Sequence, residues 1–131
     1  MHSKFTLSDL YYLLIILQTL NMIRAMNNIP REKIIAASEG LRAIAHEVRL
    51  SVLCSLLSGP MCVHELMEAT GAAQSNLSQH LAKMRLMGVI CNEKRGQNVY
   101  YRIANPAFSD LVLALQKIYC PEMCNAAKGG E

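Results

Sequence analysis

The stretch AQSNLSQHLAKMRLM, residues 73–87, has the pattern of a helix that is buried along one side and polar along the other. Its apolar residues recur at i, i+4 and i+7 and therefore share one helix face: Leu77, Leu81 and Met84. The remaining surface carries short polar groups, amides and a positive charge, with no acidic residue. Such a surface is able to donate to phosphates and to meet base edges in the major groove of DNA. An ordinary solvent-exposed helix is the alternative interpretation.

A shorter helix and a tight turn precede this stretch. The segment VHELMEATG, residues 63–71, ends at Gly71, and glycine commonly ends helices. Residues 72–74 then form the turn into the polar helix. Two short helices joined in this way predict a helix-turn-helix, in which the second helix reads DNA.

A β-hairpin is expected directly after the polar helix. The runs VICNEK, residues 89–94, and VYYRIA, residues 99–104, flank the turn RGQN and are rich in β-branched and aromatic residues. A hairpin in this position predicts a wing, whose basic tip is able to reach a phosphate or the minor groove. A purely stabilising hairpin is the alternative. The expected DNA contacts are Gln74, Ser75, Asn76, Ser78, Gln79, His80, Lys83, Arg95 and Gln97.

Helices are also predicted on both sides of these elements. Pro30 fits a helix start, and the following helix extends to about His46, with Ile34, Ser38, Leu41 and Ala45 on one face. The next helix lies within residues 49–59 and stops at a Gly-Pro pair. Pro106 opens a final helix with an apolar stripe of Leu111, Leu115 and Ile118, widened by Val112 and Tyr119. An apolar helix at the end of a domain favours a symmetric homodimer, which would place two reading helices one DNA turn apart.

The expected fold class is therefore mainly α with a β-hairpin wing, a dimeric winged helix-turn-helix of order α-α-α-α-β-β-α. We expect a DNA-binding domain at residues 29–121 and a C-terminal tail at residues 122–131. Residues 1–28 form an N-terminal extension that is either an apolar helix or the product of a wrong start codon. Its apolar run LYYLLIILQTL is short for a bilayer span, so no stable membrane association is expected.

Composition restricts the class of protein further. Hydrophobic residues make up 52% of the chain and charged residues 18%, which excludes a disordered protein, and the net charge is +3. The five cysteines are spread out, and no convincing secretory signal precedes them, so a reducing cytoplasm is the expected compartment. The sequence has no glycine-rich phosphate loop, nucleophile elbow or carboxylate pair flanked by a base, so no enzyme is predicted. No cofactor is predicted.

The order of these elements resembles the ArsR/SmtB family of winged-helix repressors. The resemblance rests on LRAIAHEVRLSVLCSLL (41–57), SNLSQHLAKMRLMGVI (75–90) and RGQNVYYRI (95–103), and it covers about residues 31–121. It implies a homodimer that binds a pseudo-palindromic operator in double-stranded DNA. It also implies release of the promoter when an inducer is sensed, and the inducer differs between branches of the family.

Two cysteines resemble those of the sulfide-responsive, persulfide-sensing branch of the family (the BigR, SqrR and YgaV type). Cys54 lies in the second of the helices expected from Pro30 onward, and Cys120 ends the last helix. In that branch, a cysteine in each of these helices is oxidised by reactive sulfur species, the two become linked through sulfur, and DNA binding falls. Peroxide would act on the same pair. A buried structural residue at Cys54 and a tail thiol without a role at Cys120 are the alternatives.

A metal or metalloid is the competing inducer. Cys62 and His64 stand where metal-sensing relatives carry a ligand pair. Zinc or arsenic needs three or four ligands, and no obvious partner occurs between residues 27 and 45. Cys124 is either a further ligand or a resolving thiol, and Cys91 is expected to be structural. A third hypothesis, from another class of function, is a winged-helix protein-interaction module that binds no DNA.

Overall fold

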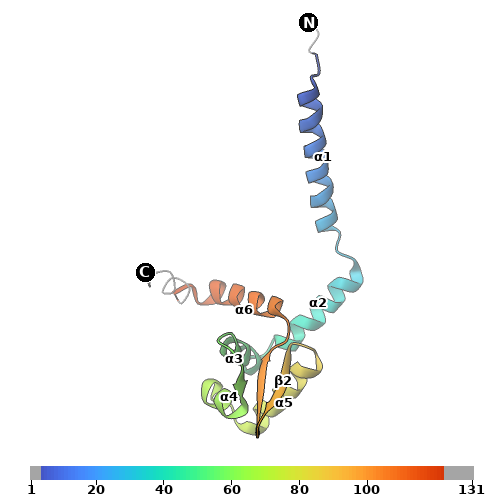
Figure 1. Cartoon of the computed structure of the whole chain (residues 1–131). Coiled ribbons are helices and arrows are strands. Elements are labelled where there is room, and N and C mark those ends of the chain that lie inside the picture. The colour runs from blue at the N-terminus through green and yellow to red at the C-terminus, as the bar shows by residue number, and fades with distance from the viewer. Residues whose placement is uncertain (1–3, 123–131) are drawn as a thin grey trace. The chain divides into compact units, whose positions relative to one another are not determined.

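The computed structural model describes residues 4–122, and the chain divides into two compact units after Ser38. The first unit contains helix α1, Leu7–Asn27, which covers the apolar N-terminal run (Figure 1). The Thr6 hydroxyl accepts from the Asp9 backbone N–H at 3.4 Å, and the Asp9 carboxylate accepts from the Thr6 N–H at 3.0 Å. This capping box satisfies helix donors that would otherwise lack partners, and it explains why the helix begins here. The Thr6 hydroxyl also donates to the Asp9 carboxylate at 2.7 Å, and this bond and the one from the Thr6 N–H lower the pKa of Asp9.

All side chains of α1 are exposed within this chain, and apolar residues occur on every side of the helix. In the part of the chain that the structure describes, no helix has both the length and the apolar character needed to cross a membrane.

The second unit holds the predicted DNA-binding elements. Helix α2, Arg31–Ile44, enters it and is followed by α3 (Glu47–Leu56), α4 (Val63–Thr70) and α5 (Gln74–Leu86). A hairpin of β2 (Ile90–Arg95) and β3 (Asn98–Ile103) comes next, and α6 (Pro106–Tyr119) ends the described fold (Figure 1). The winged helix-turn-helix prediction is confirmed.

The core of this unit joins α3, α4, α5 and the hairpin. The predicted stripe of α5 is confirmed, because Leu77, Leu81 and Met84 are at most 1% exposed. They pack with buried apolar residues of the neighbouring elements: Val52, Leu53, Leu56, Leu66, Val89 and Ile90. The buried stripe therefore fixes α5 to the core and leaves its polar side chains on the surface.

The hairpin turn is tighter than the sequence suggests. The strands pair from Ile90–Ile103 to Arg95–Asn98, so only Gly96 and Gln97 lie in the turn. Gly96 has a φ of +62°, a conformation that glycine adopts at little cost in a two-residue hairpin turn.

One strand was not predicted. β1, Met61–Cys62, pairs antiparallel with β3 and gives a sheet of order β1-β3-β2. Two residues are too few to produce an alternating pattern, and the pairing depends on a strand about forty positions further along the chain.

The predicted face of α2 is not buried in this chain. Ile34 and Leu41 are both more than half exposed, whereas Ala43 and Ile44 belong to the core. The periodic pattern correctly indicated a helix, but only its last turn reaches the core of the second unit.

Candidate DNA-binding surface and thiol pocket

The turn between α4 and α5 brings the polar helix to the surface. Gly71 caps α4 in the left-handed conformation, with φ +70° and ψ +4°, and its N–H donates to Met67 O at 2.9 Å. Helix α5 then starts after Ala73, which has no side chain able to cap it. Six of the predicted contacts on this helix are exposed: Gln74, Ser75, Asn76, Ser78, Gln79 and Lys83.

His80 differs from these residues because it is half-buried. Its ring lies against the ring of His46, with centroids 4.2 Å apart and planes tilted by 38°. His46 is the N-cap of α3, and its Nδ1 accepts from the Val48 N–H at 3.1 Å. Burial, and then the charges of His46, Arg49 and Lys83, lower the pKa of His80.

At the wing tip, Arg95 and Gln97 are exposed. The Arg95 Nε donates to the carboxylate of Glu93, and its guanidinium lies 5.3 Å from the centroid of the Tyr100 ring. These contacts orient Arg95 on one face of the hairpin. They also pair Arg95 with Glu93, which is an acidic residue in this basic segment.

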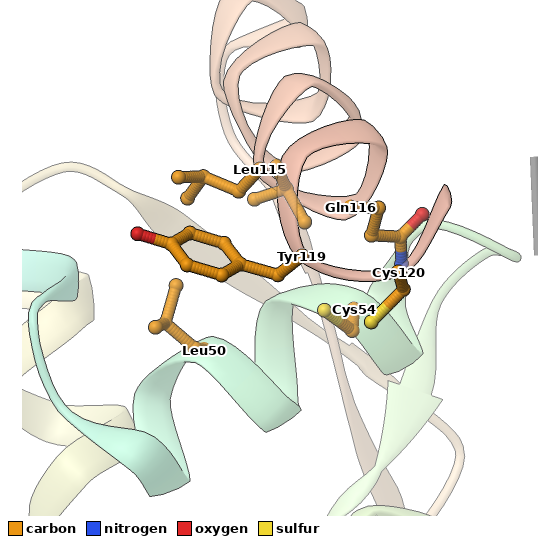
Figure 2. A pocket seen from close by; sticks show the side chains of 7 residues that line it. Leu50, Cys54, Leu115, Gln116, Tyr119 and Cys120 are labelled. Atoms are coloured by element: carbon orange, nitrogen blue, oxygen red, sulfur yellow. The ribbon is translucent and has the colours of Figure 1, made fainter. Parts of the chain in front are cut away.

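Cys54 and Cys120 line one pocket of about 180 Å³ between α3 and α6 (Figure 2). The other lining residues are uncharged: Leu50, Val112, Leu115, Gln116 and Tyr119. Figure 2 shows both sulfur atoms at the same end of the pocket, while the Tyr119 ring lies toward Leu50 and Leu115. Both cysteines are free thiols; Cys54 is exposed and Cys120 is half-buried. The fold therefore brings together two thiols that are far apart in the sequence.

The predicted metal ligands are not gathered in this way. Cys62 is the N-cap residue of α4, and its N–H donates to the Glu65 carboxylate at 2.9 Å. His64 Nε2 lies 3.3 Å from a carboxylate oxygen of Glu68, one turn further along the same exposed helix face. Between residues 4 and 122, no three His, Cys, Asp or Glu side chains form a group suited to a metal ion. Cys124 lies outside the described residues, and Cys91 is a half-buried free thiol in β2.

Arg49 was missed by the sequence analysis. It is 7% exposed, and its Nε and Nη1 atoms are buried without a hydrogen-bond partner. The spacing could have indicated this burial. Arg49 shares one face of α3 with three buried residues at i+3, i+4 and i+7: Val52, Leu53 and Leu56. A cation on a buried helix face indicates either a partner or a function.

A helix-turn-helix followed by a β-hairpin wing defines a winged helix-turn-helix protein. The family described as bacterial regulatory protein, arsR family, matches residues 46–91. The chain belongs to this family, whose members are DNA-binding transcriptional regulators and not enzymes.

Individual relatives agree with this assignment. The chain is 40% identical to the HTH-type transcriptional repressor SmtB of Mycobacterium tuberculosis over 84 residues, which are 64% of this chain and 62% of the relative. It is 39% identical to the HTH-type transcriptional regulator YgaV of Escherichia coli over 82 residues, 62% of this chain and 83% of the relative. The crystal structure of the transcriptional repressor BigR from Xylella fastidiosa matches with a TM-score of 0.62 and 32% identity, covering 70% of this chain and 98% of that one.

Proposed function

We propose that this protein is a transcriptional repressor that binds operator DNA as a homodimer and is released by oxidation of Cys54 and Cys120. The pocket that these two thiols share is the observation that carries the proposal. In a reducing cytoplasm both residues remain thiols until reactive sulfur species accumulate. The resemblance to YgaV and BigR adds support for a regulator of this kind.

DNA binding is assigned to α5 and the wing. The exposed amides and hydroxyls of α5 suit base edges in the major groove, and Lys83 suits a phosphate. Arg95 and Gln97 at the wing tip are placed to contact the backbone or the minor groove. In a homodimer, two copies of α5 would read the halves of a pseudo-palindrome.

Dimerisation is assigned to α6. Its residues Leu113, Ile118 and Tyr119 are 42%, 68% and 78% exposed in the single chain. Apolar side chains exposed along one terminal helix favour association with a second copy.

The sensing step transfers sulfur without any further oxidant. Each thiolate takes the terminal sulfur of a persulfide, R–S–SH, and releases R–SH. The terminal sulfur of one cysteine persulfide then attacks the Cβ-bound sulfur of the other and expels hydrogen sulfide. Three sulfur atoms now link Cys54 to Cys120. The link would tie α6 to α3 and change the spacing of the two reading helices, which lowers operator affinity.

Mass spectrometry after treatment with glutathione persulfide tests the sensing step. We expect a Cys54–Cys120 cross-link with added sulfur, together with loss of the gel shift on the gene's own upstream DNA. Cys54→Ser and Cys120→Ser should each keep binding DNA after treatment. Cys91→Ser is the matched control and should respond like the wild type. Full reduction of both thiols after treatment would contradict the proposed switch.

The same gel shift separates the other two hypotheses. Failure of the reduced wild-type protein to bind its upstream DNA would favour a protein-interaction module. Stoichiometric binding of Zn(II) or As(III) that releases DNA and is lost in Cys62→Ser would favour metal or metalloid sensing by Cys62 and His64.

A further inference from the structure

Arg49 is the one buried charged residue among residues 4–122. No carboxylate oxygen in this part of the chain lies within 4.0 Å of its guanidinium nitrogens. Burying a cation without an anion or hydrogen-bond acceptors is unfavourable, so such a residue is normally paired. The fold places Arg49 in the first turn of α3, beside the helix proposed to read DNA.

Basic side chains from α5 and from the cap of α3 meet next to this position, where the rings of His46 and His80 lie 4.2 Å apart. His46 precedes α3, and His80 and Lys83 extend from α5, one helical turn apart. We call these four residues the cationic cluster: His46, Arg49, His80 and Lys83. Arg49 is buried, His46 and His80 are half-buried, and Lys83 is exposed.

The cluster offers hydrogen-bond donors and no acidic group. The Nδ1 of His46 accepts from the Val48 N–H, so neutral His46 carries its proton on Nε2, which is then a donor. Arg49 contributes the donors on Nε and Nη1 that have no partner. Burial lowers the pKa of His80, and the basic groups around it lower it further: His46 at the cap of α3, Arg49 in α3 and Lys83 in α5.

We propose that the cationic cluster binds a phosphate group, and that in the operator complex this is a backbone phosphate beside the bases read by α5. The proposal rests on the DNA-binding function proposed above. Phosphate oxygens accept several charge-assisted hydrogen bonds at once, and arginine suits them because its nitrogens form a planar fork. The phosphate would supply the anion that buried Arg49 lacks and would fix the orientation of α5 through His80.

The proposal gives the pH dependence of DNA binding a definite sign. A phosphate next to His80 raises the pKa of its imidazole from the lowered value of the free protein, so binding takes up a proton. Affinity should therefore be greatest at low pH and should fall as pH rises through the pKa of His80 in the complex.

Fluorescence anisotropy with a labelled duplex of the gene's own upstream DNA tests the site. We expect Arg49→Gln to weaken binding by about tenfold and to reduce the slope of log affinity against log salt by about 1. Arg24→Gln removes the same charge from α1 and should leave affinity and slope unchanged. Arg49→Lys keeps the charge and should restore part of the affinity.

A second pair of variants keeps the test decisive if Arg49→Gln fails to fold. His46→Asn preserves an N-cap side chain for α3 but removes the imidazole donor, and it should weaken binding about threefold. His80→Asn should abolish the rise in affinity at low pH. Unchanged affinity, salt slope and pH dependence in these variants would overturn the phosphate site while leaving DNA binding by α5 intact.

Titration with inorganic phosphate distinguishes a failure of this site from a failure of the proposed DNA-binding function. In NMR titrations of the full chain, phosphate should shift the imidazole signals of His46 and His80 and raise the pKa of His80; chloride at equal ionic strength should not. These shifts in a protein that binds no DNA would retain the phosphate site and reject the DNA-binding function. No phosphate response and no effect of Arg49→Gln on DNA binding would reject the site.

Discussion

Helices α5 and α6 have almost the same length and are held in very different ways. Three side chains of α5 are at most 1% exposed, and they form one continuous stripe against the core. In α6 only Val112 is buried, although the helix is much more apolar. The polar helix is thus firmly fixed, and the apolar helix has side chains that the described residues 4–122 do not cover.

The two helices are therefore suited to different tasks. A helix that reads base edges must keep a set orientation, and a fully buried stripe provides it. A helix that transmits a chemical signal must have more than one position of similar free energy, and few buried contacts allow this. The pocket lined by Cys54 and Cys120 lies between α3 and α6. In the described chain, few side chains of α6 are buried at this contact.

The largest expected effect comes from truncating matched leucines in the two helices. Leu81→Ala should lower the free energy of unfolding by about 2–5 kcal/mol, because it leaves a cavity in the core. In the dissociated single chain, Leu113→Ala, at a position 42% exposed, should cost less than about 1 kcal/mol. Urea denaturation followed by circular dichroism measures both. Similar losses of unfolding free energy at the two positions would contradict the difference in packing between α5 and α6.

The polar face of α5 should dominate DNA affinity. Gln79→Ala combined with Lys83→Ala should weaken operator binding by about 10–100-fold, because a base contact and a phosphate contact are lost. Gln18→Ala combined with Arg24→Ala removes the same types of group from α1 and should change affinity by less than about threefold. Anisotropy titrations at fixed salt decide between these outcomes.

The exposed face of α6 should dominate self-association. Ile118→Ala should weaken the homodimer by about tenfold, since an interface side chain then buries less apolar area. Leu86→Ala, at an 87% exposed position at the end of α5, serves as the control and should leave the dimer unchanged. Sedimentation equilibrium measures both dissociation constants; a dimer weakened only by Leu86→Ala would place the interface on α5 instead.

The smallest expected effect is the pH dependence of stability. The pKa of His80 is lowered in the folded protein, so the unfolded chain binds more protons as pH falls toward and below 6.5. The free energy of unfolding should therefore decrease slightly from pH 7.5 to pH 5.5, and His80→Asn should flatten this decrease. Urea midpoints at several pH values test the sign, and a higher stability of the wild type at pH 5.5 would reverse it.

Short-range sequence patterns predicted the helices and the hairpin of the second unit well. They predicted its long-range contacts poorly. The periodic residues of α5 and the Gly-containing wing turn are local signals, and the structure has both elements. Strand β1 was missed because its two residues acquire their conformation from β3. Arg49 was not singled out, although its spacing matched the buried face of α3.

In the candidate site, too, local features could be predicted from the sequence and long-range contacts could not. The exposed groups of α5 could be named from the sequence because a helix presents every third or fourth residue on one face. The stacking of His80 on His46 depends on how α3 and α5 pack, and no local pattern encodes that contact. The shared pocket of Cys54 and Cys120 was expected from resemblance to a family, not from spacing.

The position of Cys120 at the C-cap of α6 also has a topological consequence. A covalent link from Cys54 to Cys120 would close a ring of chain that contains α4, α5 and the whole hairpin. Cross-linking a ring of this size restricts the unfolded chain and is worth about 4 kcal/mol in the chain-entropy treatment. The released, oxidised regulator should therefore melt at a higher temperature than the reduced one. Resistance to heat and to protease would then report the redox state of the regulator in the absence of DNA.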